Sequence, residues 1–148
     1  MTIYRMHRAR RKADDYQGAM MAGGRWNPIG IPMLYSAEHL SLACLEVLVH
    51  LDKGQLPLDY AWSKAEVSTT PDVLVIAAPP SITDCQAAGN DWICNQTQLA
   101  VRVPSVIIPE EFNVLLNPLH EGYESVQWSE PRLFHFDPRL FTAEPRTL

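Results

Sequence analysis

Apolar and polar residues alternate at the start of the chain, and further along the apolar residues become nearly continuous. TIYRM (2–6) and MLYS (33–36) alternate in the way typical of short strands. Between them AMMAGGRWNPIGIP (19–32) is rich in glycine and proline, which predicts a loop. From Leu40 to Leu51 apolar residues cover almost every side at about 100° per residue. We therefore expect a buried helix that Ser36 caps and that runs to about Leu51.

The rest of the chain reads as short strands separated by prolines. One short helix is expected over residues 81–95. Strands are expected at 60–67, 73–77, within 98–109, 113–118 and 132–136. Recurring prolines disfavour long helices there. The pattern predicts a single α+β domain over residues 1–148, with few helices.

The composition agrees with an ordinary globular protein and excludes several other classes. The 148 residues are 47% hydrophobic and 20% charged, with a net charge of −5, which argues against a nucleic-acid binder that uses its whole surface. The N-terminus is polar and basic, without the apolar core of a signal peptide, and no apolar run is long enough to span a membrane. The three cysteines lack C-x-x-C spacing, so neither a disulfide framework nor a zinc site is expected. These features predict a cytoplasmic protein.

From Leu40 to Leu51 Glu46 is the only carboxylate. It shares the remaining strip of the predicted helix with three residues: His39, Ala43 and His50. Burial of an unpaired carboxylate in apolar surroundings costs free energy on the order of several kcal/mol unless hydrogen-bond donors, a cation or water lie beside it. Two interpretations follow, a surface carboxylate paired with a histidine or lysine, and a cleft carboxylate that stabilises developing positive charge.

Two arginines and a tyrosine stand in contexts that suit a ligand. Arg5 lies in the first strand, where it either forms an internal ion pair, for instance with Glu46, or faces a ligand. Arg25 lies in GGRWNP, whose glycines allow close approach of the backbone to a phosphate or carboxylate, although an exposed loop arginine is the alternative. Tyr35 ends a strand just before the helix of Glu46 and can reach the same region.

Other polar residues carry weaker signals. Ser105 has no G-x-S-x-G around it, so a hydrolase nucleophile is not expected. His120 and His135 lack a partner histidine at metal-ligand spacing, so no metal site is expected.

The order of these motifs resembles the RES-domain family, toxins of RES–Xre type II toxin–antitoxin modules. The motifs are Y-R, G-G-R-W-N-P, L-Y-S-A, a helix of form L-A-x-x-E, V-P-S and L-L-N-P-x-H. They extend from Tyr4 to about His120, and RLFHFDPRL resembles the family's closing strand.

The resemblance implies an ADP-ribosyltransferase-like split β-sheet and an enzyme that depletes NAD by cleaving the nicotinamide–ribose bond. By motif, it assigns Glu46, Arg5 and Tyr35 to catalysis, and Arg5, Arg25, Tyr35 and Ser105 to NAD binding, with NAD as substrate and no metal. Asn117 and His120 match the family without an assigned role. The implied partner is an antitoxin with an Xre-like helix-turn-helix domain.

The chemistry of the residues agrees with this resemblance. Cleavage of a ribosyl bond passes through an oxocarbenium-like state, which a fixed carboxylate stabilises. The acceptor remains open between water, phosphate and a protein that becomes ADP-ribosylated. A non-enzymatic nucleic-acid-binding domain that uses the basic N-terminus, and a pure interaction domain, are further alternatives. Apolar residues in the β-rich half are compatible with a homodimer.

Overall fold

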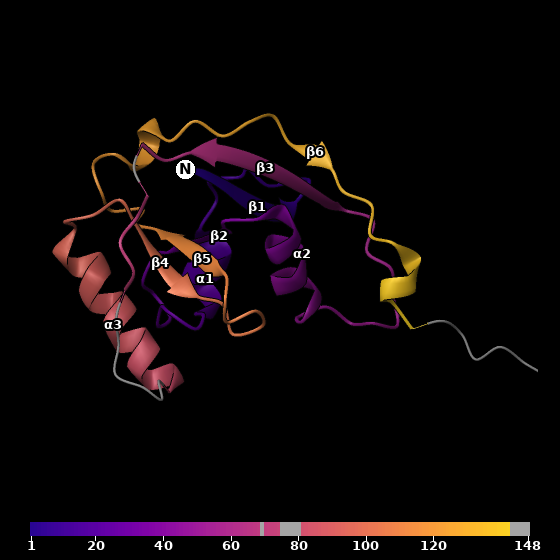
Figure 1. The fold of residues 1–148 in the computed structure, drawn as a ribbon, viewed down its shortest axis with the longest axis horizontal. Coiled ribbons are helices and arrows are strands. Elements are labelled where there is room, and N and C mark those ends of the chain that lie inside the picture. Colours follow the sequence, from indigo (N-terminus) through magenta and orange to yellow (C-terminus); the bar gives the residue numbers. More distant parts are fainter. Residues whose placement is uncertain (69, 75–80, 143–148) are drawn as a thin grey trace, which may run out of the picture.

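The computed structural model describes residues 1–68, 70–74 and 81–142, whose strands form one antiparallel sheet (Figure 1). The strand order is β4-β5-β2-β1-β3-β6. The strands are β1 (Thr2–Arg8), β2 (Leu34–Ala37), β3 (Tyr60–Glu66), β4 (Ala100–Pro104), β5 (Phe112–Leu116) and β6 (Arg132–Leu133). The helices are α1 (Gln17–Ala22), α2 (Leu40–Leu48) and α3 (Ile82–Asn95), with 3₁₀ turns η1 (Tyr123–Ser125) and η2 (Pro138–Leu140).

The sheet consists of two halves that barely touch. Strands β1 and β3 pair along their full length, and β2 pairs with β5 from end to end. The two halves meet only between β1 and β2, through the single pair Tyr4–Ala37. Beyond that pair β1 and β2 diverge. On the side of β2 that faces β1, the backbone at Tyr35 therefore borders a gap, while its other side stays paired with β5. The expected split α+β sheet is confirmed.

Helices α2 and α3 lie on the same face of the sheet, and α2 spans the split between the two halves. Register places Tyr35, Ala37 and Tyr4 on this face, because residues paired across antiparallel strands point the same way. Helix α3 packs over β4 and β5, and α2 packs against β1 and β2 (Figure 1). A hydrophobic core that includes Tyr123 covers the opposite face of the sheet.

The first helical region differs from its prediction at both ends. Ser36 is not a helix cap: it continues β2, and its hydroxyl donates to the Val114 carbonyl at 2.8 Å. Helix α2 therefore begins later, after His39, and ends at Leu48 rather than Leu51. Lys53 closes this end by donating to the carbonyls of Leu48 and Leu51.

The predicted loop at 19–32 is wrong at its start, where α1 forms one and a half turns before the glycines. A six-residue helix without a buried face leaves no periodic apolar signal in the sequence. The helix expected at 81–95 is confirmed as α3, which Ser81 and Asp84 begin with reciprocal capping hydrogen bonds.

Most of the later strands are found, some of them shorter. The strand expected at 98–109 covers only Ala100–Pro104, and that at 132–136 only Arg132–Leu133. Val73 bridges Arg102, whereas residues 75–77 of the predicted 73–77 strand lie outside the described residues. Within the described ranges, none of the helices is both long and apolar enough to cross a membrane.

Candidate active site

A cleft of about 950 Å³ opens where the two halves of the sheet part. Its walls come from β1, β2, the glycine-rich loop after α1, the outer turn of α2 and the β4–β5 connection. The volume lies at the upper end of the range of cofactor sites. Four of the residues singled out from the sequence line it: Arg5, Arg25, Tyr35 and Glu46.

Arg5 occupies the gap between the halves. Alternation along β1 places it on the opposite face from Tyr4, so its side chain reaches the cleft through the split. One terminal nitrogen donates to the Tyr35 carbonyl at 2.8 Å, and the other donates to the Asp15 carbonyl at 3.0 Å. Arg5 thus bonds the carbonyl that β2 exposes at the split, and it ties the two halves together.

Arg5 forms no direct ion pair within the described residues, although the carboxylates of Asp14 and Asp15 lie close enough to raise its pKa against the larger effect of burial. Burial lowers the pKa of Arg5 to about 10, which still leaves the guanidinium protonated at neutral pH. Its Nε is buried and makes no hydrogen bond in the described chain. The ion pairs among the described residues do not include Arg5, so the proposed pair with Glu46 is not formed. A buried cation held only by neutral carbonyls favours an anionic ligand.

Two further arginines reach the cleft. Arg8 is neutralised by Asp59 at 2.6 Å and lies over the ring of Tyr60 at 4.5 Å. Arg25 is half-buried and forms neither a hydrogen bond nor an ion pair with the described residues. Among the described arginines that line the cleft, Arg5 and Arg25 are therefore the two that form no direct ion pair.

Glu46 lies on α2 at the other side of the cleft, half-buried rather than on the outer surface. Its Oε1 accepts hydrogen bonds from the Ser105 hydroxyl at 2.8 Å and from the Asn113 amide nitrogen at 2.6 Å. Both donors are neutral groups. Its other oxygen, Oε2, has no partner in the described chain. A carboxylate fixed by one oxygen presents the other to a ligand.

Tyr35 holds the glycine-rich loop by its hydroxyl. That hydroxyl donates to Asn27 Oδ1 at 2.6 Å and accepts from the Trp26 backbone N–H at 3.0 Å. Burial raises the pKa of Tyr35 to about 12, so the phenol stays neutral. A Cβ on Gly24 would stand 2.7 Å from this hydroxyl, which is why only glycine fits there.

Buried contacts also hold the glycine-rich loop in place. Asn27 is fully buried, and its amide donates to the carbonyls of Ala19 and Ile31 at 2.9 and 3.0 Å. The Trp26 carbonyl packs so closely on α3 that a Cβ on Gly89 would stand 1.7 Å from it. Trp26 itself is 6% exposed, so most of its ring belongs to the core rather than to the cleft.

Ser105 stands behind the carboxylate. It is 3% exposed, and its hydroxyl also accepts from the backbone N–H groups of Ile107 and Ile108. These bonds orient the hydroxyl toward Glu46. The cleft is lined by the residues on either side of Ser105, so the structure places Ser105 next to Glu46 rather than on the cleft surface.

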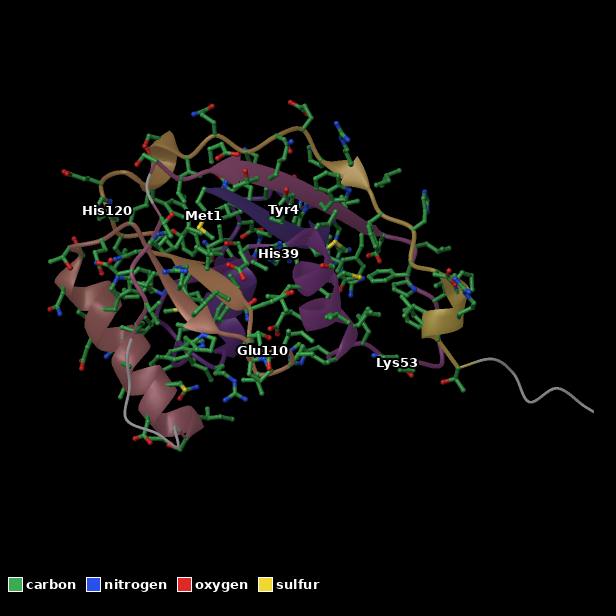
Figure 2. The ribbon with its side chains drawn as sticks, in the orientation of Figure 1. Met1, Tyr4, His39, Lys53, Glu110 and His120 are labelled. Atoms are coloured by element: carbon green, nitrogen blue, oxygen red, sulfur yellow. The ribbon has the colours of Figure 1, made fainter. Side chains whose placement is uncertain are left out.

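Asn117 and His120 lie away from the cleft. Figure 2 shows His120 at the left of the molecule, well away from α2, and its ring accepts from the Gly122 N–H. Asn117 is fully buried and accepts from the Leu119 N–H. Both shape the turn that leads to Tyr123, whose hydroxyl donates to the Asp14 carbonyl. That contact steadies the loop that Arg5 binds through Asp15.

Two site residues escaped the sequence reasoning. Asn27 and Asn113 each bond a predicted site residue, Tyr35 and Glu46 respectively. Asn27 sits inside the quoted GGRWNP, but an asparagine in a turn has a sufficient local explanation. Asn113 begins the predicted strand 113–118, and its link to Glu46 spans 67 positions, which no local pattern reveals.

The site offers cations and a carboxylate, without a metal cluster. No group of three or more His, Cys, Asp or Glu side chains among the described residues is placed to hold a metal ion. Two unpaired guanidinium groups can bind a diphosphate, and a fixed carboxylate can stabilise a neighbouring positive charge.

Comparisons with known proteins match almost the whole chain. The family described as RES domain matches residues 2–137. A protein from Sphingobium sp. named Prs ADP-ribosylating toxin is 38% identical over 143 residues, which cover 87% of this chain and 88% of that protein. A Toxin Res from Photorhabdus laumondii is 35% identical, covering 97% of this chain and 99% of its own, and one from Yersinia enterocolitica is 32% identical, covering 95% and 99%.

A solved structure has the same fold. In the crystal structure of the M. tuberculosis MbcT–MbcA toxin–antitoxin complex, a chain superimposes with a TM-score of 0.66. The match covers 94% of this chain and 85% of that chain at 22% identity.

Proposed function

Since this chain belongs to the RES-domain family, we propose that it is a toxin that depletes NAD by cleaving the bond between nicotinamide and ribose. The observation that carries the proposal is the separation of charge in the cleft. Unpaired cations line one side, and a carboxylate with one unbonded oxygen lies on the other. NAD has the complementary distribution, with an anionic diphosphate at its centre and a nicotinamide ribose that becomes positive as it reacts.

Binding is assigned to the arginines and to the tyrosine. Arg5 and Arg25 hold the diphosphate oxygens, since charge-assisted hydrogen bonds from guanidinium groups are strong and directional. Tyr35 fixes the loop that carries Arg25 and offers its ring to the nicotinamide or the adenine. Arg5 also assists catalysis, because it sets the spacing between the two halves of the sheet.

Glu46 is the catalytic residue of this proposal. The bond from C1′ of the ribose to the nicotinamide nitrogen breaks, and its electron pair moves to the pyridinium ring, which leaves as neutral nicotinamide. The ribose is left as an oxocarbenium ion, whose positive charge the Glu46 carboxylate stabilises. The leaving group takes no proton, so the site needs no general acid.

An acceptor then attacks C1′ from solution. Water gives ADP-ribose and releases one proton, whereas inorganic phosphate gives ADP-ribose that is phosphorylated at this same carbon. A protein side chain is the second candidate acceptor, because the Sphingobium relative is named an ADP-ribosylating toxin.

A toxin that consumes NAD requires restraint in its own cell. We assign that role to an antitoxin with an Xre-like helix-turn-helix domain, as the family resemblance implies. The MbcT–MbcA structure, which contains a toxin and an antitoxin, supports an arrangement of this kind.

Incubation of the purified protein with NAD tests the proposal. Free nicotinamide should appear in step with NAD loss, as followed by liquid chromatography. Mass spectrometry of parallel reactions in phosphate-free buffer, in phosphate and with cell extract should identify the acceptor. NAD that stays intact in all three reactions would contradict the proposal.

A further inference from the structure

Asn113 is the cleft residue for which neither the motifs nor the reaction above provides a role. It lies on β5, where its backbone is paired on one side with Ala37 of β2 and on the other with Val103 of β4. Paired neighbours on both sides make this one of the most rigid positions of the cleft. Its side chain lines the cleft beside Glu46.

The hydrogen bond to Glu46 fixes which way the Asn113 amide faces. An ionised carboxylate only accepts hydrogen bonds, so the group that meets Glu46 Oε1 at 2.6 Å must be the amide NH₂. The amide is planar, and its oxygen is therefore turned away from Oε1. Glu46 thus orients Asn113 as much as Asn113 orients Glu46.

Two acceptor oxygens remain, one on each residue of this hydrogen-bonded pair. Asn113 Oδ1 and Glu46 Oε2 have no hydrogen-bond partner in the described chain, and neither is among its buried unpaired atoms. Both are therefore accessible, on residues that line one cleft and are joined by a hydrogen bond. Two free acceptors that flank one hydrogen bond in the same cleft can each accept a hydrogen bond from one of two neighbouring hydroxyl groups.

We propose that Asn113 Oδ1 and Glu46 Oε2 together bind the cis-diol of the nicotinamide ribose, and that Asn113 makes the site specific for that sugar. The inference rests on the proposed function. Glu46 takes the 2′-hydroxyl, next to the carbon whose charge it stabilises. Asn113 takes the 3′-hydroxyl.

The test compares NAD with an NAD analogue that lacks only the 3′-hydroxyl of the nicotinamide ribose. For the wild-type protein, kcat/KM should be about 10- to 100-fold lower with the analogue, the effect of losing one hydrogen bond in a site built for it. For Asn113→Ala the two substrates should differ by less than about threefold, because the acceptor is gone. Melting curves establish that the variant is folded.

Ser105→Ala is the matched control. It removes the other donor to Glu46 and leaves Asn113 in place. This variant should be slower with both substrates, yet it should retain the wild-type discrimination between them. If Asn113 only positioned Glu46, Asn113→Ala would behave like Ser105→Ala: it would be slower with both substrates and would retain the wild-type discrimination.

Failure of this inference is distinct from failure of the proposed function. If the wild-type protein does not cleave NAD, the reaction itself is wrong. If it cleaves NAD and the 3′-deoxy analogue equally well, or if Asn113→Ala still discriminates, the diol assignment is overturned while NAD cleavage stands. Should Asn113→Ala not fold, Asn113→Ser takes its place, because its shorter side chain also removes the amide oxygen.

Discussion

Arg5 and Glu46 carry opposite charges on the two sides of the cleft, and the chain holds them by different means. Arg5 is buried between the sheet halves and bonded to backbone carbonyls. Glu46 is half-buried and bonded to side-chain donors through one oxygen. The hydrogen-bond partners are neutral in both cases, and neither residue is the counter-ion of the other. Such an arrangement costs stability and is understandable as a site for a dipolar ligand.

The two sides also differ in what positions them. The donors to Glu46 come from β5 and from the end of β4, within one half of the sheet. Arg5 depends on contacts from β2 and from the loop of Asp15, which Tyr123 steadies through Asp14. Glu46 itself lies on α2, which packs against both β1 and β2, so both sides of the cleft respond to how the two halves sit together.

Glu46→Gln is the substitution with the largest expected effect. It keeps the size of the side chain and removes the charge that stabilises the sugar, so turnover of NAD should fall by at least about 100-fold. Affinity for NAD should change by less than about threefold, because the diphosphate contacts remain. Nicotinamide release and calorimetric titration measure the two quantities.

Glu110→Gln is the control for that substitution. Glu110 is exposed on the loop between β4 and β5 (Figure 2), outside the residues that line the cleft. The same chemical change there should leave turnover unaltered. Equal turnover in the two variants would remove Glu46 from the mechanism.

The two arginines should separate binding from stability. Arg25→Ala should weaken NAD binding by about 10- to 100-fold without a change in Tm, since Arg25 bonds none of the described residues. Arg5→Ala should weaken binding as much and also lower Tm by several degrees, because the carbonyls of Tyr35 and Asp15 lose their donor. Release of the buried charge offsets part of that loss. A Tm for Arg5→Ala equal to that of the wild type would show that the two halves do not depend on this contact.

Ser105→Ala should have a smaller effect, confined to turnover. Asn113 still holds Oε1, so kcat should fall by about tenfold, while KM for NAD stays within about twofold. Ser105→Thr, which keeps the hydroxyl, should recover most of the rate. A change in KM alone would instead indicate that Ser105 contacts NAD.

Tyr35→Phe removes the hydroxyl that holds the loop of Arg25, and it should also change the alkaline stability of the protein. Burial raises the pKa of Tyr35 to about 12, so the folded state keeps a proton that the unfolded state loses above about pH 10. The stabilisation is present below about pH 10 and is lost as pH rises toward 12. When the free energy of unfolding is measured in urea, it should fall less steeply with rising pH over this interval in Tyr35→Phe than in the wild type. Burial also raises the pKa values of Tyr60 and Tyr123, so the slope is reduced rather than abolished.

Residues near one another in the sequence were the predictable part of this molecule. The lone charge of an apolar helix singled out Glu46, and period-two alternation found β1 and β3. Ser36 was misread as a cap because a serine before a helical run fits that pattern, whereas β5 draws it into the sheet. Asn113 and the gap that Arg5 fills depend on pairing between distant strands, which periodicity does not encode.

A crystal structure of the Glu46→Gln protein with NAD bound is the most direct test of the account. We expect the diphosphate within hydrogen-bond distance of Arg5 and Arg25, and C1′ of the nicotinamide ribose beside the side chain of residue 46. A dinucleotide bound outside the cleft, or one whose sugar lies away from residue 46, would contradict it.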